Sequence, residues 1–424
     1  MNLNGVVQNY LAAQTSNDYE FLAARNRFRV RFDKPTNFGG LKTELDLIHR
    51  FDQGQDIEFQ LKEAYIEWFL RRYDLRIGHQ KIIWGRANGS FITDIVSPVD
   101  LREFLTVSAE DIRLGITSFN AIRYFGENSL QLVVAPFFQR DLLPDADSRW
   151  FPALQISNAL SPVPVRTKNQ ESNFKLEDLQ AVLRYNLLSP QIADIDLFLM
   201  RWTHPTPAYD LSLTTNNLTN PLSIELVESY KNSWMGGLST TLKIHPRLFL
   251  LGEALFVDKK LFTRIPFSNI NDLNLSTGIE NLIDLFGLVD PNEGFLVTKP
   301  WIHSMAGFRT EIFDTTIETQ FFVEGIFNYD EQIIQEEIYK YVTIFATKSL
   351  LRNRLQLLTL SRYNIDKEDF WVQIQGQYEL NDNLQLTVGS NLFGGEKRNE
   401  ISGHLSFSQF RQNSFIFSKI ALYF

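Results

Sequence analysis

Four arginines stand at every second position of one segment near the N-terminus: Arg25, Arg27, Arg29 and Arg31. In an extended strand this spacing places all four guanidinium groups on one face. The next two segments carry carboxylates at spacings that suit the same face: Glu44, Asp46, Glu63 and Glu67. Facing rows of opposite charge can pair across strands and hold a wall in register, or they can orient and select polar solutes in a water-filled pore. Both interpretations stay open, and we predict that the eight residues line a common interior.

A second charged stretch follows Trp84 and alternates acidic and basic residues: Asp94, Asp100, Arg102, Glu103, Glu110, Asp111 and Arg113. Because it comes directly after the charged strands, we expect it to fold inward as a constriction and to meet the four arginines. The alternative is an outward-facing cap held by its own salt bridges, since loops normally lie on surfaces.

Residues for catalysis or metal binding do not form a pattern. The six histidines are scattered along the chain, with no pair at metal-ligand spacing: His49, His79, His204, His245, His303 and His404. His303 and Ser304 are adjacent, but neighbours on a strand point to opposite faces and cannot form a nucleophile and base pair. We therefore predict no catalytic residue, no metal and no cofactor. A barrel enzyme remains the least favoured interpretation.

The elements that must position these residues show the same two-residue rhythm. Asn26, Phe28, Val30 and Phe32 alternate with the arginines, and near the far end Val372, Ile374, Tyr378 and Leu380 alternate with Gln373, Gln375, Gln377 and Glu379. Leu384, Leu386 and Val388 likewise alternate with Gln385 and Thr387. One face suits lipid and the other needs water, which is typical of a transmembrane antiparallel up-and-down β-barrel. We expect Val30, Ile374 and Leu386 to face lipid and Gln375 and Gln385 to face the lumen.

Composition narrows the class of protein. The net charge of −9 and the lack of a basic tail argue against nucleic acid as a partner. The chain has no run of eighteen apolar residues that would predict a helical membrane span. The absence of cysteine fits a protein that crosses an oxidising periplasm without disulfides. Residues 1–5 lack the basic and apolar regions of a signal peptide, so we expect a mature or recombinant N-terminus.

Turn formers divide the chain into hairpins with short and long connections in alternation, within a single domain, 1–424. Short turns are predicted at 34–37, 72–74, 126–128, 189–191, 245–247, 314–315, 352–353 and 381–383. The longest connections are predicted at about 86–114, 140–175, 205–232 and 262–298. This spacing gives roughly eighteen strands, with sixteen as the main alternative. Capping patterns at Ser97–Asp100, Ser108–Asp111 and Thr277–Glu280 predict short helices in the long outer loops.

The last predicted strand places Ile416, Ser418, Ile420, Leu422 and Phe424 on its outward face. This amphipathic pattern, which ends on an aromatic residue, is like the signal read by the outer-membrane insertion machinery. We therefore expect that machinery, together with outer-membrane lipid, among the partners of the chain.

A resemblance to a known family lies between residues 75 and 114. The strand Leu75-Arg76-Ile77-Gly78-His79-Gln80-Lys81-Ile82-Ile83-Trp84-Gly85 is followed by Asp94, by Ser97-Pro98-Val99-Asp100-Leu101-Arg102-Glu103-Phe104 and by Glu110-Asp111-Ile112-Arg113. This stretch resembles an uncharacterised bacterial outer-membrane barrel family, although Asn88 stands where that family more often has aspartate. The resemblance implies a periplasmic or RND-type exporter partner that handles hydrophobic or lipid-like molecules, and it supplies no catalytic residue.

Together these observations predict a barrel in the outer membrane of a Gram-negative bacterium. Its expected role is that of a porin-like channel, or of the outer-membrane component of a lipid or hydrophobe export route. The alternative is a plugged barrel that acts as a structural or docking subunit of an envelope complex.

Overall fold

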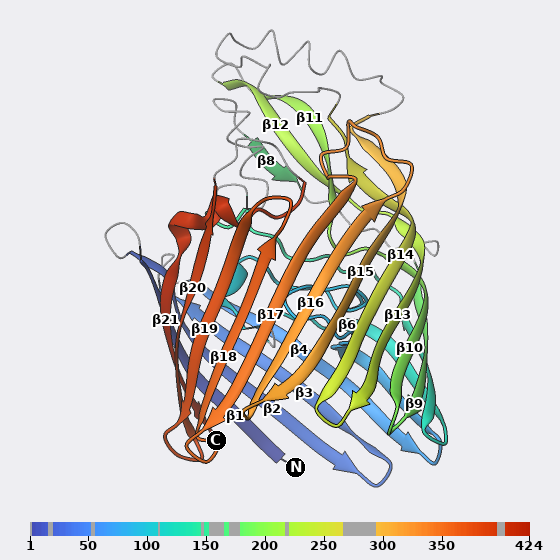
Figure 1. Cartoon of the computed structure of the whole chain (residues 1–424), viewed down its shortest axis with the longest axis vertical. Helices are drawn as coiled ribbons and strands as arrows, with labels where there is room; N and C mark the ends of the chain where they lie inside the picture. The colour runs from blue at the N-terminus through green and yellow to red at the C-terminus, as the bar shows by residue number, and fades with distance from the viewer. Residues whose placement is uncertain are drawn as a thin grey trace.

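Eighteen antiparallel strands of the described residues form a closed barrel, which confirms the predicted fold class and strand number and not the alternative of sixteen (Figure 1). The computed structural model describes residues 2–15, 20–51, 56–108, 111–145, 148–151, 165–168, 179–216, 220–265, 294–396 and 403–424. The barrel strands are β1 (Asn2–Gln14), β2 (Phe21–Thr36), β3 (Gly39–Arg50), β4 (Asp56–Leu70), β5 (Tyr73–Gln80), β6 (Ile116–Phe125), β7 (Asn128–Ala135), β9 (Gln180–Ser189), β10 (Ala193–Thr203), β13 (Asn232–His245), β14 (Leu248–Thr263), β15 (Leu296–Ile312), β16 (Thr315–Ile326), β17 (Ile338–Leu350), β18 (Leu355–Asn364), β19 (Asp369–Glu379), β20 (Leu384–Gly395) and β21 (Phe415–Tyr423).

The first strand closes the barrel by pairing with both β2 and β21. At this seam Gly5 and Phe424 exchange backbone hydrogen bonds, with N···O distances of 2.9 and 3.1 Å. The Phe424 ring stacks on Phe28 of β2 and lies where a side chain at position 5 would have to be. Gly5 therefore gives the seam the space that the aromatic ring occupies.

Short turns lie at the end of the barrel that carries both chain termini, and the long connections lie at the other end (Figure 1). The longest connections run over 81–115, 136–179, 204–231 and 264–295, close to the predicted ranges. The first turn comes later than predicted, because Lys34 and Pro35 still pair with Leu41 and Gly40 of β3. A small sheet of β8 (Val165–Lys168), β11 (Ala208–Asn216) and β12 (Asn220–Ser229) stands above the barrel mouth (Figure 1).

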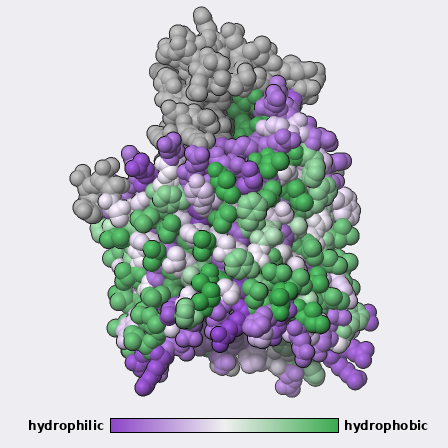
Figure 2. Space-filling view, viewed as in Figure 1, coloured by the Kyte–Doolittle hydropathy of each residue, from purple (hydrophilic) through white to green (hydrophobic). Residues whose placement is uncertain are grey.

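The outer surface carries a broad apolar band between two polar rims (Figure 2). Outward side chains from all around the barrel contribute to it, among them Phe28, Leu132, Leu199, Phe321, Ile374 and Ile420. Ile374 is half exposed on the outside, while Thr387 and Asn391 of the next strand are buried inside. This is the dyad pattern of a barrel wall with lipid outside. Among the described residues, no helix is long and apolar enough to cross a membrane.

The predicted loop helices are wrong for the described residues, where the helical segments are the 3₁₀ turns η1 (Phe104–Thr106) and η5 (Phe407–Asn413). Ser97 does not cap a helix, because its hydroxyl accepts a hydrogen bond from the Ile82 N–H at 2.7 Å. The hydroxyl of Ser108 instead donates to the Asp111 carboxylate, and the chain makes one turn without continuing. The capping pattern at 277–280 lies outside the described residues.

The inside of the barrel is less polar than the alternation predicts. Inward side chains of the upper wall form one large apolar core, which includes Met200, Met235, Leu255, Val257, Met305 and Phe322. A second core of aromatic residues lies under η5 and includes Trp150, Trp371, Phe393, Phe410 and Phe415. Such buried surfaces need a covering segment, and connections from the long-loop end supply it.

Candidate functional site

The connection from β5 to β6, residues 81–115 and here called the inward loop, enters the barrel instead of covering its mouth. Its apolar side chains Ile82, Ile92, Ile95 and Val96 are buried in the core of the upper wall. The Asp94 carboxylate accepts a hydrogen bond from the Trp84 N–H at 3.0 Å, which folds the loop back on itself. Burial of these side chains anchors the loop through the hydrophobic effect.

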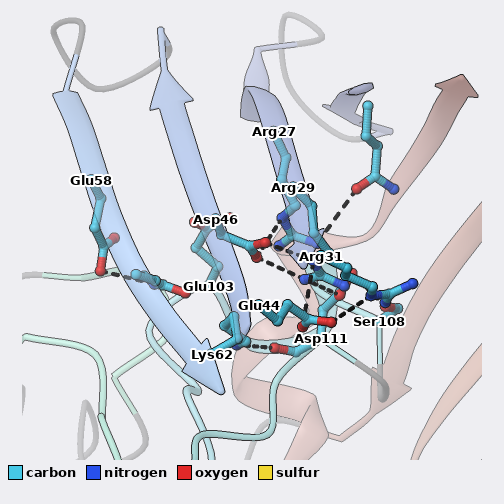
Figure 3. Close-up of polar contacts among 12 residues, drawn as sticks. Arg27, Arg29, Arg31, Glu44, Asp46, Glu58, Lys62, Glu103, Ser108 and Asp111 are labelled. Carbon is cyan, nitrogen blue, oxygen red and sulfur yellow. Dashed lines mark hydrogen bonds and ion pairs between the residues drawn. The ribbon is translucent and has the colours of Figure 1, made fainter. Parts of the chain in front are cut away.

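Arg27, Arg29 and Arg31 of β2 lie on the inner face and pair with carboxylates of β3 (Figure 3), while Arg25 pairs with Glu103 of the inward loop. Arg29 forms a bidentate salt bridge with Asp46, in which two of its N–H groups donate at 2.6 and 2.7 Å. Arg31 contacts Glu44 at 2.5 Å, and Lys81 of the inward loop contacts the same carboxylate at 3.0 Å. Fork-like contacts between guanidinium and carboxylate fix the orientation of both groups as well as their spacing.

The remaining predicted wall residues also face inward, on β4. Glu67 lies 3.3 Å from both Lys42 and Arg76. Glu63 accepts a hydrogen bond from the backbone N–H of Lys81 at 2.9 Å. The pairing of β3 with β4 shifts register between Glu44 and Leu45, which leaves Lys62 of β4 without a partner on β3. The Lys62 ammonium donates to the Asp111 carbonyl at 2.8 Å.

Two loop carboxylates meet the arginines inside the barrel, as the inward-folding interpretation predicts. Glu103 pairs with Arg25 and, at 2.6 Å, with Arg50. Asp111 pairs with Arg27 and, at 2.8 Å, with Arg29. These four pairs join the loop to β2 and β3, and their side chains are largely buried.

Electrostatics keep both loop carboxylates ionised. Burial alone would raise the pKa of Asp111, but the guanidinium groups of Arg27 and Arg29 outweigh it and hold the pKa well below its usual range. Burial also opposes ionisation of Glu103, and here Arg25 and Arg50 lower the pKa. The pairs between loop and wall are therefore charged at neutral pH.

Other predicted loop residues form salt bridges within the loop or with β4. The loop is therefore held partly by its own salt bridges, although it does not face outward as the alternative predicts. Arg102 contacts Asp100 at 2.6 Å and Glu58 of β4 at 2.8 Å. Arg113 pairs with Asp94 and donates to the Ser97 carbonyl at 2.9 Å. Glu110 lies outside the described residues.

Sequence reasoning missed the residues of the opposite wall that receive the loop. Asp194 of β10, Glu253 of β14 and Glu318 and Gln320 of β16 all contact residues 86–93. A local signal exists for Glu253, which is a buried carboxylate between the apolar Leu251 and Leu255 on the inward face of β14. That signal does not say which distant segment supplies the partner.

Two of the six histidines, His303 and His404, lie near one another on the inner wall beside Glu324. His303 contacts the Tyr341 hydroxyl at 2.8 Å, and both His303 and His404 lie just under 4 Å from Glu324, at 3.9 and 3.8 Å. Ser304 points to the other face of β15 and contacts the Val323 carbonyl. In the described part of the chain, no group of three or more candidate ligands has the geometry to hold a metal ion.

Solved barrel structures share this fold at low sequence identity. OccAB2 of Acinetobacter baumannii aligns with 100% of this chain and 96% of its own, at 9% identity and a TM-score of 0.51. OpdK of Pseudomonas aeruginosa, solved with vanillate, aligns with 100% of this chain and 97% of its own, at 7% identity and a TM-score of 0.51. A second structure of OpdK, described as an outer membrane protein, has the same coverage and identity and a TM-score of 0.50.

No family model and no protein of curated function matches the sequence. The structural comparisons therefore establish the fold, which is that of the porin barrels of Gram-negative outer membranes. Together with the apolar band, this fold agrees with the predicted location in the outer membrane.

Proposed function

We propose that the chain is an outer-membrane transport barrel in which solutes pass a lumen narrowed by the inward loop. The observation that carries the proposal is the contact of this loop with both sides of the barrel interior. Glu103 and Asp111 bind the arginines of β2, and residues 86–93 contact β10, β14 and β16. A segment held across the interior by charged groups determines which solutes can pass it.

The test is the conductance of the purified protein in planar lipid bilayers. Deleting residues 94–113 removes the part of the loop that faces the arginines, and we expect the single-channel conductance to rise.

A second candidate function has its own supporting observation. Ile82, Ile92, Ile95 and Val96 are buried in the upper-wall core, as they would be in a permanent plug. A filled barrel would act as a structural or docking subunit of an envelope complex. This interpretation replaces passage if neither the unmodified protein nor the 94–113 deletion conducts.

The finer proposal concerns cargo and direction. The resemblance of residues 75–114 implies export of hydrophobic or lipid-like molecules beside an RND-type exporter, and the apolar inner wall is compatible with such cargo. Cells that lack the barrel should then retain more of a hydrophobic fluorescent dye than cells that carry it. Equal retention in the two strains would count against the export route and would leave the channel proposal intact.

A further inference from the structure

Glu253 is a buried carboxylate on the inner face of β14, 3% exposed, and it is surrounded by the backbone of the inward loop. It accepts hydrogen bonds from the N–H groups of Arg86 at 2.5 Å, Ala87 at 3.0 Å and Thr93 at 2.7 Å. The Thr93 hydroxyl donates to the same carboxylate at 2.6 Å. Backbone N–H groups that converge on one carboxylate form an anion site, and here the wall supplies the anion.

The loop backbone is shaped for this contact. Gly85 has a φ of +95°, which side chains rarely tolerate, and a Cβ at this position would lie 2.9 Å from the Glu253 Oε1 atom. Glycine thus lets the chain approach the carboxylate and turn around it.

Contacts on either side hold the same segment. Arg86 pairs with Asp194 of β10. The Asn88 N–H donates to Gln320 of β16 at 2.7 Å, and the Asn88 amide donates to Glu318 at 2.8 Å. Residues 85–93, the loop tip, are therefore fixed on three wall strands with Glu253 in the middle.

The loop tip supplies the hydrogen-bond donors of the Glu253 carboxylate. Among the described residues no basic side chain forms an ion pair with it, and its neighbours on β14 are the apolar Leu251, Leu255 and Val257. If the tip left, the carboxylate would lose these four hydrogen bonds and would need lumenal water in their place, so the contacts stabilise the docked tip. The contact between the loop tip and β14 should therefore be sensitive to substitution of Glu253.

We propose that Glu253 is the positioning residue that fixes the loop tip against β14 and so sets the width of the passage. This inference rests on the proposed transport function. Glutamine at this position has one acceptor oxygen and an amide that itself donates, so it cannot accept from both Arg86–Ala87 and Thr93. Glu253→Gln should therefore release the tip.

Loop position can be measured independently of conductance because the chain has no cysteine. In a Ser90→Cys reporter, the thiol replaces a hydroxyl that contacts Tyr341 at 2.7 Å. We expect Glu253→Gln to raise the rate of maleimide labelling of this reporter thiol by about tenfold or more and to raise conductance. Glu379→Gln removes an exposed carboxylate at the short-turn end of β19, and it should change neither measurement.

A disulfide lock provides the reverse test. A Cβ at Gly237 would lie 3.2 Å from the Thr93 Cγ2 atom, so Thr93→Cys with Gly237→Cys can link the tip to β13. Added to Glu253→Gln, the oxidised pair should return conductance toward the original value, and reduction should raise it again. Thr93→Cys alone should show no response to oxidation.

Gly85→Ala is a second variant for use if the Glu253→Gln protein does not insert into the membrane. It leaves the carboxylate in place and pushes the tip away, so it should also raise labelling of the reporter thiol at position 90. Unchanged labelling in an inserted Glu253→Gln or Gly85→Ala protein overturns the positioning role. Faster labelling without conductance in any variant supports the positioning role and contradicts the proposed passage.

Discussion

Arg27 and Arg29 each contact carboxylates of both the barrel wall and the inward loop. Arg29 lies 2.6 Å from Asp46 and 2.8 Å from Asp111, and Arg27 lies 3.5 Å from Asp46 and also pairs with Asp111. Removing one partner of a buried pair leaves the other charge uncompensated. The electrostatic potential of the lumen should therefore depend on these two residues.

We predict that Arg27→Gln with Arg29→Gln shifts ion selectivity toward cations, because the double variant removes two positive charges from the lumen. Reversal potentials under a KCl gradient measure the shift. Arg71→Gln with Arg72→Gln removes the same charge from an exposed turn and is the matched control. Identical reversal potentials for both double variants would show that Arg27 and Arg29 do not influence ion passage.

Gly5 carries a second prediction at this scale. A Cβ at this position would overlap the Phe424 ring and lie 2.6 Å from the Arg29 carbonyl, so both the ring and a neighbouring backbone would have to move. We expect Gly5→Val to weaken barrel closure and to lower the temperature at which the folded, fast-migrating form is lost in gel electrophoresis. Gly236→Val is the control, since no atom lies within 4 Å of its Cβ position; equal loss in both variants would contradict this account of the seam.

Along each barrel strand, side chains face the outside and the interior in alternation, so the sequence predicts their orientation. In the inward loop, local sequence patterns do not predict which contacts the residues make. In β19, Ile374 is 50% exposed on the outside, while its neighbour Gln375 belongs to the inward face. In the loop, the same capping residues that begin helices elsewhere are used for tertiary contacts: Ser97 binds Ile82, and Asp100 binds Arg102.

We predict that arginine at Ile374 destabilises the barrel by about 2 to 4 kcal/mol, while arginine at Gln375 is tolerated. The cost arises because an outward guanidinium must enter hydrocarbon, whereas the inward one stays in the polar interior. Denaturant unfolding in lipid vesicles measures the free energy of unfolding of both variants. On other strands, arginine at Val30 or Leu386 can be compared with arginine at Gln385 in the same way. Similar losses on both faces would refute the assigned strand orientation.

The whole molecule has two unlike ends. Tight turns and both termini lie at one end, and the long connections with the small sheet lie at the other (Figure 1). Barrels of the outer membrane have their short turns in the periplasm and their long loops outside the cell. The orientation of this chain follows from that rule.

A labelling experiment on intact cells tests both the location and the orientation. Glu331 lies exposed in the connection from β16 to β17, and Asp314 lies exposed in the tight turn before β16. A membrane-impermeant maleimide should modify Glu331→Cys and not Asp314→Cys, while both should react after the outer membrane is permeabilised. Labelling of Asp314→Cys alone in intact cells would mean the reverse orientation.

The sequence by itself determined the properties that alternate along a strand. Which residues of β2, β19 and β20 face outward, the number of strands and the positions of the turns all follow from two-residue periodicity and turn chemistry, which act over a few neighbouring residues. The shared face of the β2 arginines, and the carboxylates that lie opposite Arg29 and Arg31 on β3, follow for the same reason.

Only the tertiary structure decided where the inward loop goes and what holds it. Thr93 and Glu253 are separated by 160 residues in sequence, and neither position has a local feature that names the other as its partner. The apolar upper wall likewise became visible only when strands from β6 to β17 curved around one interior and their inward side chains met the loop. Packing across a closed barrel joins distant segments, and it overrode the local helix signals because burying Ile92, Ile95 and Val96 stabilises more than an isolated helical turn.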